Sequence, residues 1–180
     1  MRSPLLVAVA LAFAMVSAGL TLAAGQATTW KLSTTLKASA EVPKPTAVPV
    51  GATGSFAGTA VVNASGGAKI AWQLKFSKLS GPAAAAHIHI GKVGKAGNVM
   101  KALCGPCKNG RKGTATVTKA QLATIKAGRA YVNIHTAANA AGEIRGQVKA
   151  KLGPSTGGSP PPAPPPPGPV PPPPPPDPYP

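Results

Sequence analysis

Three histidines are the residues of this chain best suited to bind a metal, and two of them are separated by a single residue. His87 and His89 lie in the run "AHIHIG", and His135 lies near the end of "AYVNIHT". If both runs are β-strands, residues two apart share a face and are about 6.6 Å apart. Three imidazoles that converge on one ion suit copper or zinc. The spacing predicts a metal site at His87, His89 and His135, and a polar strand face that binds nothing is the alternative.

The only two cysteines form the motif "CGPC", Cys104 to Cys107. In thioredoxin-like proteins this spacing opens a helix after a strand, within a βαβ unit. Here the Gly-rich stretch "KNGRKGT" follows it, and no such unit is indicated. We therefore expect a local disulfide between Cys104 and Cys107 in an oxidising compartment. A redox-active dithiol and a zinc site shared with histidines are the alternatives.

Alternating apolar and polar residues predict that β-strands position these side chains. The alternation is clearest within residues 30–37, 54–63 and 69–79, and shorter strands are predicted at 87–90, 99–103, 114–117, 130–135 and 143–152. The one helical candidate is "TKAQLATIKAG", where Thr118 can cap the start and Gly128 can end the helix. Many short strands with one short helix predict an all-β fold, an antiparallel Greek-key sandwich or barrel.

The same alternation assigns a face to each candidate site residue. Ile88, Ile90, Val132 and Ile134 take the core side, so that all three histidines point outward. In "GEIRGQV" the apolar residues Ile144 and Val148 face the core, which turns Glu143, Arg145 and Gln147 outward. We expect Glu143 to pair with Arg145 or with a neighbouring lysine. If these strands are neighbours, their outward residues form one constellation.

Composition divides the chain into three parts. Residues 1–25 combine one basic residue, a long apolar run and small residues at the end, which predicts a secretion signal. An uncleaved membrane anchor is the alternative. Residues 26–152 are long enough for one core and predict a single β-domain. Residues 153–180 hold most of the 23 prolines and predict a disordered, proline-rich tail. We expect a secreted, periplasmic or cell-surface protein.

Charge indicates the kind of partner. The chain has 19 Lys and Arg residues against 3 acidic residues, a formal net charge of +16. Such a surface favours anionic partners, and we expect anionic cell-surface polymers or another extracellular ligand. Aromatic residues are not interleaved with the lysines, so that no specific nucleic-acid binding is expected. Paired carboxylates and a Ser-His-Asp pattern are both absent from the sequence. We therefore expect a binding or structural protein rather than an enzyme.

Two long stretches resemble the CHRD domain, a module named from chordin and found in exported bacterial proteins. They are "AAAAHIHIGKVGKAGNV", followed by "LCGPC", and "LATIKAGRAYVNIHTAANAAGEIRGQV". The resemblance covers most of residues 30–148. It implies an extracellular, β-rich module without an established enzymatic activity. Growth-factor binding is not implied, because the chain lacks the cysteine-rich modules of chordin.

The order of the same motifs is also similar to copper–zinc superoxide dismutases, which are Greek-key barrels. On that similarity His87, His89 and His135 match copper ligands, and Arg145 matches the arginine that guides the anion. The chain has no fourth histidine to bridge copper and zinc, and no zinc-site cluster lies between the two runs. The similarity implies a shared barrel fold and a modified three-histidine site, and does not imply dismutase activity.

Overall fold

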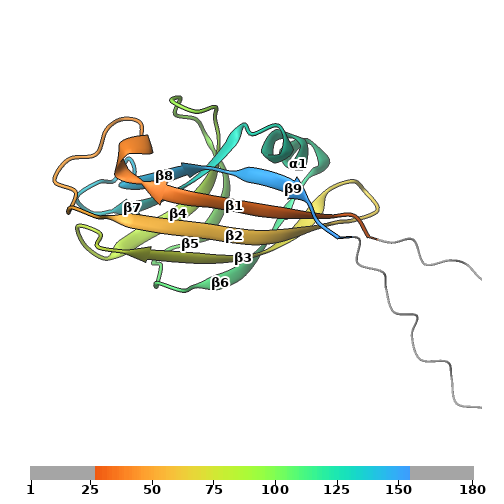
Figure 1. Cartoon of the computed structure of the whole chain (residues 1–180), viewed down its shortest axis with the longest axis horizontal. Helices are drawn as coiled ribbons and strands as arrows, with labels where there is room; N and C mark the ends of the chain where they lie inside the picture. Colours follow the sequence, from red (N-terminus) through yellow and green to blue (C-terminus); the bar gives the residue numbers. More distant parts are fainter. Residues whose placement is uncertain (1–26, 155–180) are drawn as a thin grey trace, which may run out of the picture.

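In residues 27–154 of the computed structural model, nine antiparallel strands form a nearly closed barrel with one short α-helix (Figure 1). The structure describes residues 27–154. The predicted signal, and all but two residues of the predicted tail, lie outside this range, so that the domain boundaries stay predictions. The elements are β1 (Thr29–Lys37), η1 (Ala38–Ala40), β2 (Thr53–Val62), β3 (Ala68–Ser77), β4 (Ala83–Ile90), β5 (Val99–Cys104), β6 (Lys112–Val117), α1 (Lys119–Lys126), β7 (Ala130–Thr136), β8 (Ile144–Gln147) and β9 (Lys149–Leu152).

Strand order is what brings the candidate site residues together. The strands follow each other as β5-β4-β7-β8-β1-β2-β3-β6, and β9 pairs with β1 beside β8. Neighbours in space are thus often distant in sequence, as in Greek-key folds. The predicted all-β class is confirmed. The adjacency of β4, β7 and β8 places the HIHI, YVNIH and IRGQ segments side by side.

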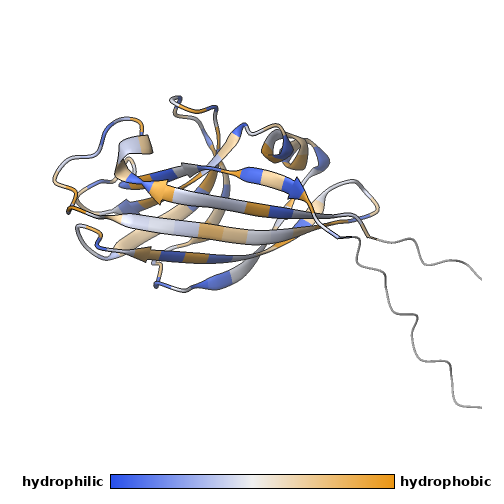
Figure 2. Ribbon diagram, in the orientation of Figure 1, coloured by the Kyte–Doolittle hydropathy of each residue, from blue (hydrophilic) through white to orange (hydrophobic). Residues whose placement is uncertain are grey.

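Alternation along the strands builds the barrel core. The inward residues of β1, β2 and β3 include Leu32, Phe56 and Ile70, all almost inaccessible to solvent, while the lysines of β1 and β3 face water. Figure 2 shows this alternation as hydrophilic and hydrophobic bands along single strands. The capping box of Thr118 and Gln121 starts α1, and Gly128 follows it with φ +66°, the left-handed conformation that glycine favours.

The predicted single strand at 143–152 is wrong, because the structure has two strands there. β8 pairs with β7 along its whole length and with β1 at Arg145, whereas β9 pairs with β1. At the break Val148 is buried in the core and donates its N–H to Ala130 O. Alternation alone does not reveal this break, since the apolar residues keep the same spacing on both sides of it.

Two segments cover the polar side of β4, β7 and β8. The first, residues 38–52, includes η1, and the second is the loop 91–98 between β4 and β5. We call them the first and second cover segments (Figure 1). The predicted outward face is therefore not a solvent-exposed face: the side chains do point away from the hydrophobic core, but Asn133, Arg145 and His89 are buried. Within residues 27–154, no helix has the length and apolarity needed to cross a membrane.

Candidate metal centre

All three histidines meet on one side of the β4–β7 pair. In the register of these strands Ala85 pairs with His135, and His87 pairs with Asn133. His89 lies two residues beyond His87 on the same face, opposite Tyr131. The ladder therefore places the histidines on the two strands so that their rings converge.

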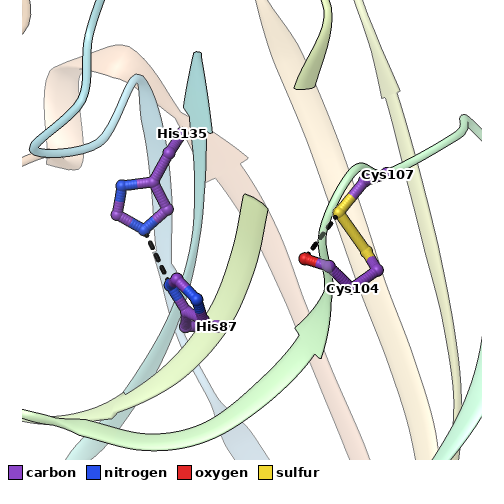
Figure 3. The surroundings of a disulfide bond; sticks show 4 residues. All are labelled: His87, Cys104, Cys107 and His135. Atoms are coloured by element: carbon purple, nitrogen blue, oxygen red, sulfur yellow. Dashed lines mark hydrogen bonds between the residues drawn. A yellow bond between two sulfur atoms is a disulfide. The ribbon is translucent and has the colours of Figure 1, made fainter. Parts of the chain in front are cut away.

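The ring geometry suits a single small ion. One nitrogen from each ring belongs to a group whose members lie within 4.8 Å of one another. His87 Nδ1 and His135 Nε2 are 3.0 Å apart (Figure 3). Bonds of about 2.0–2.1 Å to one tetrahedral ion put its ligand nitrogens about 3.4 Å apart. The widest separation needs to close by about 1.4 Å, which a rotation of the side chains can supply.

The second nitrogen of two rings is held by a backbone carbonyl. His89 Nδ1 lies 2.9 Å from Gly97 O, and His135 Nδ1 lies 2.9 Å from Ala140 O. A carbonyl can only accept, so that both Nδ1 atoms carry the proton and both Nε2 atoms present a lone pair. His89 Nε2 is buried and makes no hydrogen bond of normal geometry among residues 27–154, although the Asn133 side chain lies close enough to raise the pKa of this ring. Metal-bound histidines are commonly oriented in this way.

His87 and His135 are joined by a hydrogen bond between their rings. Since His135 Nε2 presents a lone pair, His87 Nδ1 donates to it. A bound ion would take the place of this hydrogen, and the proton of His87 would move to its Nε2. Burial, and then the nearby His135 and His89 rings, lowers the pKa of His87 below the ordinary value of 6.5. Burial also lowers the pKa of His89, more than the hydrogen bond to Gly97 raises it. Both rings are thus neutral near pH 7 and able to bind a metal.

Tyr131 and Arg145 form a stack behind His89. The Tyr131 ring lies parallel to the His89 ring, at 4.9 Å between centroids and 11° between planes. On its other side the Arg145 guanidinium carbon lies 3.4 Å from the Tyr131 centroid. Tyr131 Oη also donates to Gly97 O, the carbonyl that holds His89. The Tyr131 ring therefore packs against one face of the His89 ring, and its hydroxyl group also bonds to the second cover segment at Gly97.

The position of Arg145 does not support its predicted role as an anion guide. Only 2% of its surface is exposed, and Nη2 donates to Lys92 O and Lys95 O of the second cover segment. Gln147 adds a bond from Nε2 to Gly91 O. Arg145 therefore anchors a loop. The motif "GEIRGQ" is explained largely by this anchoring, which sequence spacing does not reveal.

The predicted pairing of Glu143 with Arg145 or a lysine is wrong. Glu143 is fully buried and accepts hydrogen bonds from Ser80, Thr136 and Asn139. Burial raises the pKa of this carboxyl, but these bonds outweigh it and hold the pKa below the ordinary value. The cluster fixes the turn after β7, and this turn supplies the carbonyl of Ala140 to His135.

Glu41 and Asn133 are buried polar residues near the site, and of the two only Asn133 shares a strand face with a candidate residue, His135. Both are about 1% exposed, and each has one oxygen without a partner in the described part of the chain. Burial raises the pKa of Glu41 to about 6, against smaller opposing effects of the Val42 N–H and the Arg145 charge. The signal for Glu41 was its rarity, since Glu41 and Glu143 are the only glutamates in the chain.

Cys104 and Cys107 lie at disulfide distance, with 2.15 Å between the sulfurs and 5.3 Å between the Cα atoms (Figure 3). Cys104 ends β5 opposite Ala86, one residue before His87. The pair thus fixes the chain next to the histidines. Neither cysteine belongs to the group of histidines that can hold an ion, so that a shared zinc site finds no support in this geometry.

The structure is thus a nearly closed Greek-key barrel that carries a cluster of three histidines on its β4–β7 pair. The family model of the CHRD domain matches residues 32–148. The chain therefore belongs to the CHRD family, as the resemblance implied. CHRD domains are typically extracellular and are not a known enzyme family. Searches among curated proteins and among solved structures found no match to this chain.

Proposed function

We propose that this protein is an extracellular binding module that holds one copper ion through His87, His89 and His135. The observation that carries the proposal is that the three rings each offer one nitrogen within 4.8 Å of the others, while the buried Nε2 of His89 makes no hydrogen bond of normal geometry among the described residues. Burying such an acceptor without a partner is costly. A metal ion satisfies it and the lone pair of His135 together.

Copper is favoured over zinc by the ligand set. All three ligands are imidazoles, which bind both metals, and copper binds more tightly than zinc to a given set of nitrogens. With three protein ligands, one coordination position stays open to solvent or to an exogenous ligand. We assign no catalytic step to the ion, because the histidine that bridges two metals in superoxide dismutases has no counterpart in this chain.

Calorimetric titration with Cu²⁺ and with Zn²⁺ tests the metal proposal. We expect one copper per chain, bound more tightly than zinc, and a loss of about 100-fold or more in copper affinity for His87→Gln, His89→Gln. The variant Lys108→Gln removes an exposed side chain outside the cluster and should bind like wild type. Equal copper binding by wild type and the double histidine variant contradicts the proposal.

We infer that the protein is exported. The extracellular character of CHRD domains supports this, together with the signal predicted at residues 1–25. Expression in a bacterial host followed by fractionation tests it. The protein should be found outside the cytoplasm, with a new N-terminus near residue 26. Retention of the full chain in the cytoplasm would contradict export.

A second candidate function is binding of anionic polysaccharide by a lysine-bearing face of the sheet. We call this surface the basic sheet face; it is formed by the outward residues of β9, β1, β2 and β3. Lys31 pairs with Lys151 and Ser33 pairs with Lys149, while Thr35, Ser55 and Lys75 form one row across three strands. These residues are exposed. Lysines and small hydroxyl side chains share this face.

Chromatography on immobilised heparin tests the basic sheet face. Lys31→Glu, Lys151→Glu should elute at clearly lower salt than wild type, because both charges lie within the proposed contact. Lys108→Glu, Lys119→Glu makes the same change in net charge on other parts of the surface and serves as the control. Equal shifts for the two pairs would show that only net charge matters, which overturns a specific face.

A further inference from the structure

A groove of 260 Å³ lies between α1 and the paired ends of β1 and β2. It is found at the end of the barrel where β1 begins and β9 ends (Figure 1). We call it the Trp30 groove. Its strand side is formed by Trp30 and Val62, and its helix side by Lys119, Leu122, Ala123 and Lys126. These four helical residues have the spacing i, i+3, i+4, i+7, which places side chains on one face of a helix. Neither the histidine cluster nor the basic sheet face includes this groove.

Trp30 presents apolar surface to this groove. The side chain is half-buried, and one face of its ring is covered by the ammonium of Lys126, with Nζ 4.3 Å from the ring centroid. Lys126 is itself exposed, so that its side chain can leave the ring. Leu152 pairs with Trp30 across β9 and β1, on the same side of the sheet, and is 67% exposed. Adjoining apolar surface with lysines at its rim is typical of a contact site.

The described chain ends at the edge of the Trp30 groove. Two residues beyond the pair of Trp30 and Leu152, the same register places Pro154 opposite Thr28, which lines the groove. Gly153 N donates to Thr29 O, and Thr29 Oγ1 donates to Pro154 O. The next 26 residues, 155–180, therefore start beside the groove. Residues 1–26 also adjoin it, but they hold the predicted secretion signal, which export removes.

The composition of the tail suits an aromatic groove. Residues 155–159, STGGS, contain two glycines that permit the chain to reverse direction. Residues 160–167, PPPAPPPP, have the composition of a polyproline II helix, the form in which Pro-rich segments dock into aromatic-lined grooves. Its backbone carbonyls make no internal hydrogen bonds and can accept from Lys119 and Lys126. The eight residues of α1 are about 12 Å long, which four residues of polyproline II span at about 3.1 Å each.

We propose that residues 160–167 dock in the Trp30 groove of their own chain. Proline rings pack on Trp30 in place of the Lys126 ammonium, which moves to a carbonyl of the segment. The fixed φ of proline keeps the entropy cost of docking low. The tail is then a ligand of its own barrel rather than a free spacer, and any other Pro-rich segment has to compete with it for the groove.

Indole NMR signals of the ¹⁵N-labelled full chain test the docking, since Trp30 and Trp72 are the only tryptophans. The test variant carries four substitutions in the docking segment, Pro161→Ser, Pro162→Ser, Pro164→Ser and Pro165→Ser. It should shift the Trp30 signal and leave that of Trp72, which is 5% exposed, in place. The control makes the same changes further along the tail, Pro171→Ser, Pro172→Ser, Pro174→Ser and Pro175→Ser, and should match wild type. A Trp30 signal that is the same in the test variant and in wild type overturns the proposal.

Two matched variants of α1 locate the contact. Ala123→Gln lengthens an exposed side chain that lines the groove, so that the four test substitutions should no longer shift the Trp30 signal in this background. Ala120→Gln makes the same change at an exposed position of α1 outside the groove lining and should preserve the shift. The same shift in both backgrounds contradicts docking in the groove.

Dilution separates docking within one chain from docking between two chains. Docking within one chain predicts a Trp30 signal that does not depend on protein concentration. A wild-type signal that approaches that of the test variant on dilution would show that the tail of a second copy fills the groove, and would overturn the proposal.

Discussion

His89 has the most constrained side chain of the histidine cluster. Its Nδ1 is bonded to Gly97 O, its ring is stacked on Tyr131, and its buried Nε2 makes no hydrogen bond of normal geometry in the described chain. A ring held by one hydrogen bond and one stacked neighbour presents its lone pair in one direction only. Such preorganisation reduces the entropy that ordering a ligand costs when a metal binds.

Tyr131→Leu should weaken copper binding without removing a ligand. The substitution deletes the stack on His89 and the Oη bond to Gly97 O, so that the His89 ring gains freedom. Groups that orient metal ligands typically change metal affinity 10–100-fold, and we expect a loss of about tenfold. Calorimetric titration measures it, with Leu103→Ala as a partly buried control outside the site. An unchanged affinity would show that the backbone alone orients His89.

Glu41→Gln should alter the pH dependence of stability. Burial raises the pKa of Glu41 in the folded protein from 4.5 to about 6, so that the folded state binds its proton more tightly than the unfolded state does. Glu41 therefore lowers the stability of wild type by about 2 kcal/mol as pH rises from 4 to 7, and a glutamine does not. Urea unfolding of both proteins at pH 4 and pH 7 measures the difference, in which the histidine contributions largely cancel. A stability gap between wild type and variant that is the same at both pH values would be inconsistent with a buried carboxyl.

At the scale of elements, the turn between β7 and β8 links the polar cluster to the histidines. Its carbonyl at Ala140 accepts from His135, and Gly142 within it has φ +133°. A Cβ at Gly142 would lie 2.5 Å from Glu41 Oε2 and 2.9 Å from Asn133 Nδ2. The close approach of Glu41 to the strand pair thus requires glycine at this position.

Gly142→Ala should destabilise the protein by about 3 kcal/mol or more, since it combines a strained backbone with a clash against buried side chains. Gly128→Ala also creates a residue with positive φ, at +66°, but a Cβ there meets nothing within 4 Å. We expect about 1–2 kcal/mol for that control. Chemical denaturation of the two variants measures the contrast. Similar losses would mean that packing at Gly142 is not tight.

Local patterns predicted the elements well and their partners poorly. Alternation located the strands, and the capping residue Thr118 located α1, because both signals lie within a few residues of each other. The strand break at Val148 and the cover over the polar face depend on contacts between distant segments. The three histidines were found from their own spacing, whereas Glu41 and the anchoring role of Arg145 depend on loops whose paths the sequence does not encode locally.

At the scale of the whole molecule, copper binding should stabilise the barrel. The site joins β4 to β7, and its carbonyl partners lie in the second cover segment and in the turn before β8. An ion that binds only the folded state adds about 2.7 kcal/mol when its free concentration is 100 times the dissociation constant. Thermal unfolding with and without Cu²⁺ should show a higher midpoint with the metal. A chelator should reverse the increase, and an unchanged midpoint at saturating copper would contradict binding to the fold.

The metal centre that we propose consists of three imidazoles that hold one copper ion. Electron paramagnetic resonance of the Cu²⁺-loaded protein, with histidine labelled by ¹⁵N, tests it most directly. We predict hyperfine coupling to three histidine nitrogens in wild type and to two in His135→Gln. A spectrum without histidine coupling, or one that His135→Gln leaves unchanged, would contradict it.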